Sequence, residues 1–265
     1  MKRYFLILVM LCFAALWGCK KDDSENPSKS IPRNEIHYTS TDGNIVELYS
    51  EDEASMYPFG EGVSIVSNVY ENGKGIITCD GKITVIGSDA FFRCYNLTSI
   101  TIPDSVTAIG YSAFFRCYNL TSITIPDSVT FIGEYAFEDC TSLTSITIPA
   151  GVTDIGQYAF AGCESLTSIT IPQGVTIIRE GLFHRCTNLT SITIPDSVSI
   201  IYYYAFYDCY KLTSIYCKSD TPPMLNDDIS YHTTIYVPEK SVNSYKTSKY
   251  WSRYADRIVG YNFEK

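Results

Sequence analysis

A step of 23 residues dominates the middle of this chain. Six cysteines follow one another at this step, and six leucines, each opening the tetrapeptide Leu-Thr-Ser-Ile, keep the same step three residues later: Cys94, Cys117, Cys140, Cys163, Cys186 and Cys209, with Leu97, Leu120, Leu143, Leu166, Leu189 and Leu212. No insertion interrupts the series. One such unit offers too few apolar side chains to fold alone, so the units are predicted to stack as a solenoid and bury those side chains together.

A single unit shows how each rung of the solenoid is built. In residues 120–125 the apolar residues follow the spacing L-x-x-L-x-L, and the central Ser-Ile-Thr alternates outward, inward and outward as a strand requires. Pro126 ends this strand because proline cannot donate to a ladder. Residues 128–132 predict a second short strand, and the apolar spacing in residues 134–140 predicts one or two helical or 3₁₀ turns.

The repeated pattern I-P-x-x-V-T-x-I-x-x-x-A-F-x-x-C-x-x-L-T-S-I-T extends over residues 83–217 and resembles that of the BspA-like leucine-rich-repeat family. The resemblance implies a β-rich leucine-rich-repeat solenoid, curved and right-handed. Its parallel β-sheet would lie on the concave face, with short strands and short helical turns on the other side. The resemblance also implies a bacterial surface protein that adheres to host or matrix ligands and carries no catalytic residues.

The N-terminus has the features of a secretion signal. A basic dipeptide precedes an apolar run over residues 5–16, which is too short for a membrane-spanning helix. Cys19, preceded by glycine, resembles the lipobox of bacterial lipoproteins, and the Lys-Lys-Asp-Asp that follows resembles the surface-export signal of Bacteroidetes lipoproteins. We therefore expect a signal peptide at 1–18, lipidation at Cys19 and a flexible tether within 19–33, with a plain signal peptide cut elsewhere as the alternative. The protein would then lie at the outer membrane, lipid-anchored and exposed at the cell surface.

Residues 34–82 precede the repeat and are expected to form an N-terminal cap. Segments 37–40 and 45–48 flank Thr-Asp-Gly-Asn, a turn sequence that predicts a hairpin between them. Segment 75–79 aligns with the repeat strands when one step of 23 is added, so it is predicted to form a degenerate opening rung.

Residues 218–265 leave the 23-residue period and are expected to form a C-terminal cap, which also resembles the cap common in that family. The sequence predicts a strand at 233–237 and a helix over 239–249. The residues expected to close the end of the core are Trp251, Tyr254 and Ile258.

Ten cysteines invite three interpretations: disulfides, a metal site or packing. Neighbours in the repeated column would lie about 5 Å apart, within disulfide range, and export favours oxidation. One identical residue per rung, with parallel side chains, suits a column of small buried hydrophobes better. A zinc site lacks its usual spacing because no C-x-x-C occurs. We therefore expect a reduced packing column, leave some disulfide pairing open, and expect no metal and no other cofactor.

Charge and motifs argue against several classes of function. The net charge is −9, whereas a general nucleic-acid binder needs a basic face. The chain has no H-E-x-x-H, G-x-S-x-G or P-loop, and His37, His184 and His232 are expected to be ordinary surface residues. We therefore expect neither an enzyme nor a partner that is a nucleic acid.

Side chains that differ between units are the first candidates for ligand binding, because packing does not dictate them. Tyrosine and arginine are typical of binding hot spots. They gather, with phenylalanine, in the first two units and the last one: Phe92, Arg93, Tyr95, Tyr111, Phe115, Arg116 and Tyr118, then Tyr202, Tyr203, Tyr204, Tyr207 and Tyr210. Compositional drift toward tyrosine is the alternative.

The outward positions of the repeat strands are the second candidates. They form uncharged columns of serine and threonine, whose central members are Ser122, Thr124, Ser145 and Thr147. The alternative is that these residues only fill the strand face, since threonine suits strands and like residues stack well.

Three Asp-Ser-Val triplets, at Ser105, Ser128 and Ser197, resemble the O-glycosylation motif of Bacteroidetes exported proteins. Because the triplet lies within the repeat, chance recurrence is the alternative. Taken together, the sequence favours a monomeric, non-catalytic, membrane-anchored lipoprotein that binds an extracellular protein or glycan. A passive structural or spacer protein of the cell envelope is the alternative.

Overall fold

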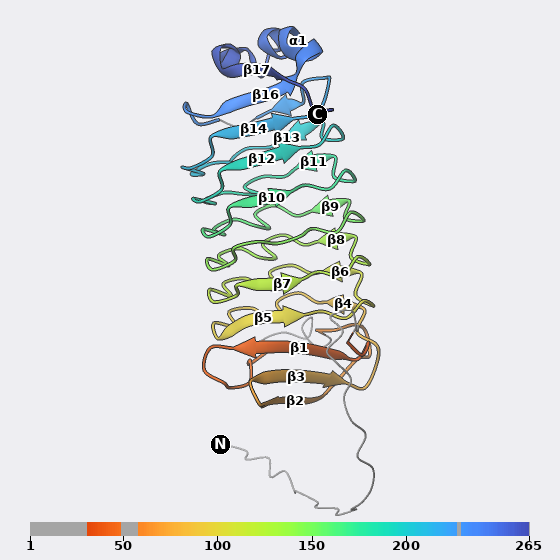
Figure 1. The fold of residues 1–265 in the computed structure, drawn as a ribbon. Helices are drawn as coiled ribbons and strands as arrows, with labels where there is room; N and C mark the ends of the chain where they lie inside the picture. Colours follow the sequence, from red (N-terminus) through yellow and green to blue (C-terminus); the bar gives the residue numbers. More distant parts are fainter. Residues whose placement is uncertain (1–30, 49–57, 227–228, 265) are drawn as a thin grey trace, which may run out of the picture.

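The computed structural model describes residues 31–48, 58–226 and 229–264. These residues form an elongated solenoid whose rungs stack along one axis (Figure 1). The predicted fold class, a β-rich leucine-rich-repeat solenoid, is confirmed. The predicted signal peptide, Cys19 and the tether as far as residue 30 lie outside the described residues.

One side of the solenoid carries the main parallel sheet. Its strands align at the 23-residue step, so that Ser99 pairs with Ser122, and Ser168 with Ser191. The repeat strands are β5 (Leu97–Thr101), β7 (Ser122–Thr124), β10 (Ser168–Thr170), β12 (Ser191–Ile194) and β14 (Ser214–Cys217). Residues 143–148 occupy the rung between β7 and β10 without strand pairing, which divides the main sheet into two.

A second side carries the short strands that the sequence predicts after each proline. They pair in parallel and in register, for example Ile109 with Ile132. Their bounds are β4 (Val85–Ile86), β6 (Ala108–Ile109), β8 (Phe131–Ile132), β9 (Asp154–Ile155), β11 (Ile177–Ile178), β13 (Ile200–Ile201) and β15 (Met224–Leu225).

The third side, called here the turn face, consists of hydrogen-bonded turns where short helical turns are expected. Two residues in each turn have left-handed φ values between 48° and 68°, and a left-handed residue interrupts a right-handed helix. The two series are Asp89, Ser112, Tyr135, Tyr158, Gly181 and Tyr204, and Arg93, Arg116, Asp139, Gly162, Arg185 and Asp208. Backbone amides on this face donate to the next rung instead, as from Phe114 to the Ala136 carbonyl at 2.8 Å.

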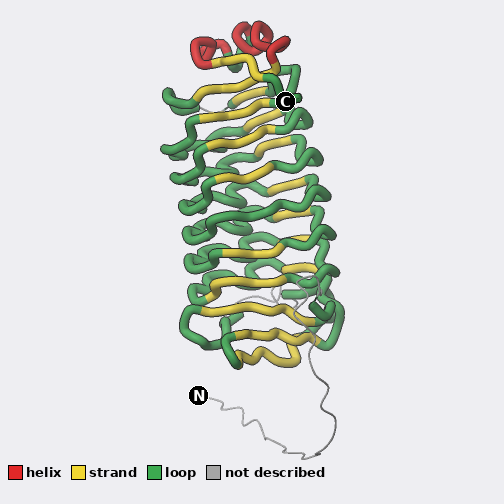
Figure 2. The backbone as a smooth tube through the Cα atoms, in the orientation of Figure 1, coloured by secondary structure: helices red, strands yellow, loops and turns green. Residues whose placement is uncertain are grey.

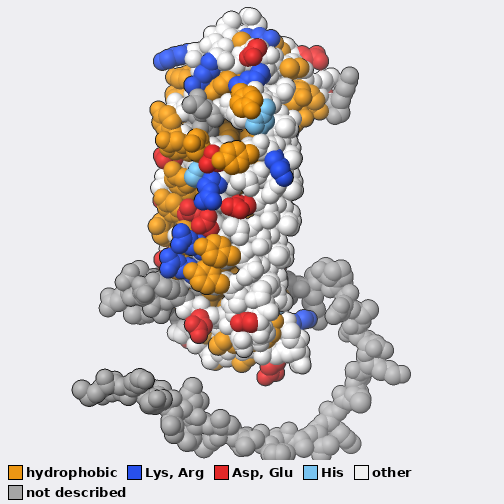
Figure 3. All heavy atoms as spheres, turned by 90° about the vertical axis from the view of Figure 1, so that its left-hand side faces the viewer, with side chains coloured by type: hydrophobic (Ala, Val, Ile, Leu, Met, Phe, Trp, Pro, Cys, Tyr) orange, Lys and Arg blue, Asp and Glu red, His pale blue; other side chains and the backbone are white. Residues whose placement is uncertain are grey.

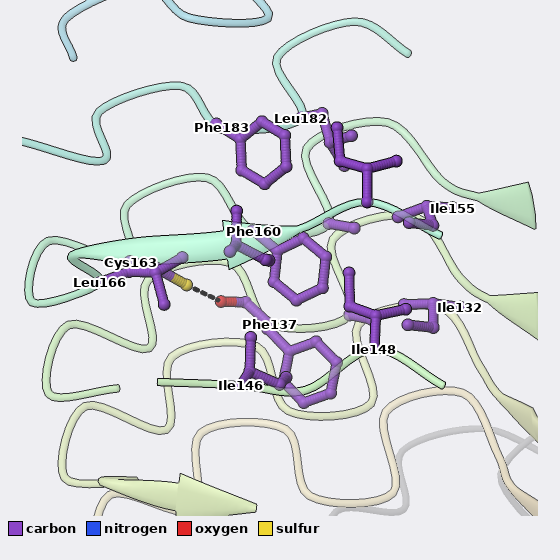
Figure 4. Close-up of a cluster of buried hydrophobic side chains, with 14 of the residues drawn as sticks. Ile132, Phe137, Ile146, Ile148, Ile155, Phe160, Cys163, Leu166, Leu182 and Phe183 are labelled. Atoms are coloured by element: carbon purple, nitrogen blue, oxygen red, sulfur yellow. Dashed lines mark hydrogen bonds between the residues drawn. The ribbon is translucent and has the colours of Figure 1, made fainter. Parts of the chain in front are cut away.

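The core is a set of columns of identical side chains that run the length of the solenoid. Phe137, Phe160 and Phe183 lie one above another at its centre (Figure 4). The repeated cysteines are buried and form no disulfide bonds with one another, as the packing interpretation predicts. From Cys117 onward, each repeat thiol donates to a phenylalanine carbonyl of the preceding rung, as Cys163 Sγ does to Phe137 at 3.3 Å (Figure 4). The Cys94 thiol donates to the Glu47 carbonyl of the N-terminal cap at 3.2 Å.

The N-terminal cap is built differently from the prediction. The expected hairpin is wrong, because residues 45–48 form no strand and β1 (Glu35–Ser40) pairs antiparallel with β3 (Lys74–Cys79) and with β5. The tight hairpin joins β2 (Ile65–Glu71) to β3 through Asn72 and Gly73, both with positive φ, which is the two-residue turn that Asn-Gly favours. Since β1 is inserted between β3 and β5, segment 75–79 is not an opening rung beside the first repeat strand.

The C-terminal cap confirms the predicted strand and helix and adds one strand. β16 (Thr234–Pro238) is followed by η2 (Glu239–Ser241), α1 (Val242–Thr247) and η3 (Ser252–Arg257), and helices in the described chain lie only at this end (Figure 2). The last strand, β17 (Ile258–Tyr261), was not expected and pairs in parallel with β16. Trp251 is fully buried, and its indole donates to the Pro223 carbonyl at 2.7 Å, so it closes the core as predicted.

Candidate ligand-binding surface

A continuous row of rings runs along the turn face. We call it the turn-face ladder. Its ring centroids are 5.5 Å to 6.5 Å apart from one member to the next, in the order Tyr111, Tyr135, Tyr158, His184, Tyr207, Tyr204 and Tyr203. The ladder therefore joins the two tyrosine clusters that the sequence places in separate units.

Three rings of the turn-face ladder sit on strained backbone. Tyr135, Tyr158 and Tyr204 have φ of 57°, 55° and 59°, a left-handed conformation that bulky residues rarely adopt. Gly181 occupies the same position of its own turn, with φ of 61°. The fold therefore accepts glycine at this position, and tyrosine there carries a conformational cost of about 1–2 kcal/mol.

Burial shifts the pKa of three rings of the ladder toward their neutral forms. Burial raises the pKa of Tyr158 to about 12, helped by a hydrogen bond of 2.8 Å from its hydroxyl to the Glu180 carboxylate. Burial also raises the pKa of Tyr135 and lowers that of His184, against a smaller opposing effect of Asp208. His184 is thus a neutral ring packed against Tyr158 and Tyr207.

The candidates in the first two repeats form a second aromatic group beside the start of the ladder. Tyr95 and Tyr118 stack at 5.3 Å. Arg93 lies over the Phe92 ring at 4.9 Å, and Arg116 lies over Phe115 at the same distance, both within cation–π range. Arg116 also forms an ion pair of 3.3 Å with Asp139, which fixes its position.

A hollow of about 450 Å³ separates this aromatic group from the N-terminal cap. Arg93 and Tyr95 line it on the repeat side, and Asp42, Asn44 and Glu47 line it on the cap side. Hydrogen bonds from Asn44, with a further one from Asn96, lower the pKa of Asp42. The hollow therefore presents an ionised carboxylate facing a guanidinium.

The candidates in the last repeat are all exposed, and three of them, Tyr203, Tyr204 and Tyr210, are more exposed than any ring of the first two repeats. Tyr203, Tyr204 and Tyr207 contact one another, whereas Tyr202 and Tyr210 flank them. Tyr210 is 65% exposed. Figure 3 shows hydrophobic side chains gathered along one long edge of the molecule, with charged side chains beside them.

The hydroxyl columns of the main sheet are open to solvent. Ser122, Thr124, Ser145 and Thr147 are all exposed, as the alternation predicts. They offer only small hydroxyls on a flat surface, with no ring or charge among them. The structure therefore leaves both interpretations of these columns possible, ligand contact and strand filler.

The sequence analysis missed the middle of the turn-face ladder. Tyr135 and Tyr158 stand alone in their units, and His184 was expected to be an ordinary surface residue. A signal was present, because Tyr135 and Tyr158 are one step of 23 apart and Tyr204 lies two steps further on. Only the left-handed turns show that these positions project along one face.

Comparison with known proteins agrees with this architecture. A family model described as BspA type leucine rich repeat region matches residues 64–172 in six copies. This part of the chain is therefore similar to BspA-type leucine-rich repeat regions. No match was found among curated proteins.

Several solved structures are similar to this chain. A leucine rich cell surface protein from Faecalibacterium prausnitzii is 27% identical, with a TM-score of 0.44, and the match covers 67% of this chain and 63% of that one. A leucine rich repeat protein from T. pallidum is 28% identical, with a TM-score of 0.41 and coverage of 50% and 73%. The pneumococcal vaccine antigen PcpA is 15% identical over 74% of this chain and 48% of its own, and its TM-score of 0.53 reflects a shared fold.

The three Asp-Ser-Val serines have a structural role in the rungs of the solenoid. Each hydroxyl donates to a carbonyl of the preceding rung: Ser105 to Ile83 at 2.6 Å, Ser128 to Val106 at 2.5 Å and Ser197 to Val175 at 2.8 Å. Ser105 is also buried. These bonds explain the recurrence of serine without modification, and glycosylation stays a prediction.

Within the described ranges, no group of His, Cys, Asp or Glu side chains could hold a metal ion. No helix among the described residues is long and apolar enough to cross a membrane. Burial raises the pKa of the Cys94 thiol to about 12, and it raises the pKa of the Cys140 thiol well above its ordinary value. A thiol held neutral in this way is a poor nucleophile.

Proposed function

We propose that this chain is a non-catalytic binding protein of the cell surface that holds a protein ligand along the turn-face ladder. The observation that carries the proposal is the strained backbone of Tyr135, Tyr158 and Tyr204. Residues in rare backbone conformations gather where the side chain has a role that outweighs their cost. Gly181 shows that the solenoid does not itself need a ring at this position.

The chemistry of the ladder supports a protein as the ligand. Interfaces between proteins are enriched in tyrosine and arginine, which supply large contact area with little loss of conformational freedom. Arg93 and Arg116 add cation–π pairs next to the ladder. The rings are exposed at both ends of the ladder and half-buried in its middle, and a row that continues over several rungs suits an extended partner surface better than a small molecule.

We also infer that the mature protein is lipid-anchored through Cys19 at the outer surface. The support is the N-terminal sequence, in which an apolar run ends at Gly-Cys and Lys-Lys-Asp-Asp follows. Cys19→Ser should move the protein from the membrane fraction to the soluble fraction. Persistent membrane association of this variant would refute the anchor.

The ladder can be tested with an array of purified extracellular matrix proteins, probed with the full mature chain. We expect binding to at least one array protein, and at least tenfold weaker binding when Tyr203, Tyr204 and Tyr207 are changed together to serine. Tyr231→Ser is the matched control, because Tyr231 is 87% exposed and lies outside the ladder.

Tyr204→Gly provides a sharper version of this test. Glycine relieves the left-handed strain at a position whose ring is exposed, so the melting temperature should stay level or rise while binding weakens. A loss of binding with no loss of stability identifies a functional ring. Binding equal to that of the unchanged protein would contradict the proposal.

A passive spacer of the cell envelope is the second candidate function. It is favoured by the rung-to-rung hydrogen bonds, since backbone bonds on the turn face add to those of the sheets and make a stiff column. Failure to bind any array protein, with weakened envelope integrity in a deletion strain, would support the spacer and overturn the binding proposal.

A further inference from the structure

The threonine column of the main sheet ends in a group of rings near the C-terminal cap. Thr193 pairs with Tyr216, and Tyr216 pairs with Tyr236 on the next strand. Tyr216 and Tyr236 stack at 4.6 Å with an interplanar angle of 11°. Tyr261 packs edge-on against both, at 5.3 Å and 5.7 Å, and Phe263 follows at 4.9 Å. We call Tyr216, Tyr236, Tyr261 and Phe263 the terminal aromatic cluster.

The terminal aromatic cluster does not serve to close the core. Trp251 and Tyr245 do that on the inner side of the cap, where both are fully buried. Tyr216 and Tyr236 lie on the outer face of β14 and β16, between inward-facing residues that are buried. Tyr261 is 41% exposed. The rings therefore form a partly open platform on the sheet surface.

A hollow of about 430 Å³ lies beside this platform. Tyr261 and Phe263 line its aromatic part, and the remaining lining residues are Lys218, Asp220, Pro238, Glu239, Lys240, Asn262 and Glu264. Its volume is within the range of small-ligand sites, which is about 300–1,000 Å³. The hollow thus combines an apolar wall with several hydrogen-bonding groups.

Two of these groups are fixed by each other. Lys240 Nζ lies 2.8 Å from Asp220 Oδ2, and Ser241 donates to Asp220 Oδ1 at 3.2 Å. The hydrogen bond from Lys240 lowers the pKa of Asp220, and the same bond raises the pKa of Lys240. The hollow therefore presents an oriented carboxylate and an oriented ammonium group at neutral pH.

The balance of charge narrows the ligand class. Two lysines face three carboxylates in the lining, which disfavours a phosphate or another polyanion. The number of charged groups likewise disfavours a purely apolar ligand, which could not replace their hydration. A neutral molecule that has both apolar C–H faces and many hydroxyl groups satisfies the rings and the polar groups together.

We propose that the terminal aromatic cluster and its hollow form a binding site for a neutral oligosaccharide. Sugar rings pack their C–H faces on Tyr216, Tyr236 and Tyr261, and hydroxyl groups donate to Asp220 and accept from Lys218. A longer chain continues over the half-buried Thr193 and the exposed Thr170 in the same column. This site lies on the sheet face and is separate from the turn-face ladder, so it adds a second ligand class to the proposed function.

The test is affinity electrophoresis of the full chain through gels that contain β-glucan, arabinoxylan, galactomannan or starch. We expect retardation in at least one gel, and at least tenfold weaker binding for Tyr261→Ala. Tyr261→Phe keeps the ring and should stay within about threefold of the unchanged protein. Tyr204→Gly, on the ladder, should be retarded normally, so that loss of one site is distinguished from loss of the other.

A folding control and a second variant keep the result clear. Tyr261 is exposed near the end of the chain, so its alanine variant should melt close to the unchanged protein. Asp220→Asn removes one carboxylate of the hollow at little cost to stability, because its ion pair is exposed, and it should also weaken retardation. Absence of retardation in every gel, or equal retardation of Tyr261→Ala and the unchanged protein, would overturn the site.

Discussion

The rungs before and after Gly156 differ in how closely they stack on the turn side. Gly110, Gly133 and Gly156 take one position of their turns, and a Cβ atom built on Gly133 would lie 2.5 Å from the Gly110 carbonyl carbon. Arg179 and Tyr202 take the same position one and two steps later. The core phenylalanine rings are 5.1–5.5 Å apart from Phe91 to Phe160, and 6.0–6.1 Å apart from Phe160 to Phe206.

This difference shows what glycine contributes here. Gly110, Gly133 and Gly156 do not have a positive φ, so their backbone conformation does not require glycine. Glycine is needed there because a side chain would collide with the backbone of the preceding rung. The ring orientations on the turn face do not follow this division. In the tight half Tyr135 stacks flat on Tyr158 at 5° but meets Tyr111 at 74°. Rung spacing therefore distinguishes the two halves in the core and not along the turn-face ladder.

The largest expected effect comes from the phenylalanine column. Phe137 and Phe183 are both fully buried between two rings, at the tight and the wide spacing respectively. Phe137→Ala should lower the free energy of unfolding by about 4 kcal/mol and Phe183→Ala by about 3 kcal/mol, because a wider gap already forfeits part of the dispersion energy. Urea denaturation of the pair measures the difference, and equal losses would show that the spacing has no energetic meaning.

Gly133→Ala is expected to cause the next largest loss of stability. The added methyl group meets backbone atoms of the preceding rung, which cannot rotate away, so the unfolding free energy should fall by about 3 kcal/mol. That corresponds to a melting temperature roughly 6–12 °C lower for a chain of this size. Arg179→Ala is the control at the same position, where a Cβ is already present and only an exposed ion pair with Asp154 is lost. A large loss of stability in Arg179→Ala would contradict the interpretation that the close approach of two backbones makes Gly133 necessary.

The features that recur in the repeats could be predicted from the sequence, whereas several features that occur only once, in the caps, could not. The 23-residue step predicts the strands, the buried cysteine column and the alternation of Ser122 and Thr124, because each is enforced in every rung. The caps occur once each. There, Asn72-Gly73 formed the hairpin that was assigned to Thr41–Asn44, and β1 was inserted against the direction of the repeat.

The candidate site was predicted only at its ends. Tyr203, Tyr204 and Tyr207 stand out as a run of tyrosines, whereas Tyr135 and Tyr158 are single residues whose direction depends on a left-handed φ. A periodic pattern reveals which residues share a column but not that a turn residue has left-handed backbone. For the same reason the terminal aromatic cluster was not foreseen, since Tyr261 lies on a strand outside the repeat period.

The cysteine column should contribute equally to stability in the tight half, before Gly156, and in the wide half, after it. The Cys140 thiol donates to Phe114 and the Cys186 thiol to Phe160, both at 3.2 Å, and burial raises the pKa of both well above the ordinary 9.0. The two thiols ionise at a lower pH in the unfolded state than in the folded state. Their contribution to the free energy of unfolding is therefore complete below about pH 9, and it falls as the pH rises above 9. In that range each thiol should lower the free energy of unfolding by about 1.4 kcal/mol for every pH unit.

Cys140→Ala and Cys186→Ala should therefore flatten the alkaline loss of stability by the same amount. Denaturation midpoints measured from pH 8 to pH 11 provide the test. Folded protein should also resist alkylation by iodoacetamide at pH 8, with reaction appearing on unfolding. A clear difference between the two variants would mean that rung spacing reaches the thiol column as well.

The smallest expected effect concerns Glu138, in the tight half. Burial and the neighbouring Asp139 raise its pKa to about 7, against the opposing effect of Arg116 and Arg185. A carboxyl group with a raised pKa in the folded state favours folding below its unfolded value, near 4.5, and this contribution is lost as pH rises toward 7. Glu138→Gln should therefore stabilise the protein at pH 8 by about 1 kcal/mol, since solvent screens part of the effect, and should change little at pH 4.

Glu138 takes the position that Phe115 holds one rung earlier and Ala161 one rung later. The Glu138 carboxylate therefore lies at a position where the neighbouring rungs have apolar side chains. We attribute its burial to the close spacing of the rungs on either side. Glu134→Gln, at an exposed carboxylate of the same turn, is the matched control for replacing a glutamate by glutamine. If Gly133→Ala spreads the rungs, the Glu138 side chain should regain water and its pKa should fall toward 4.5, which an NMR titration of the carboxyl carbon would detect. An unchanged pKa in that variant would show that burial of Glu138 does not depend on how closely the rungs stack.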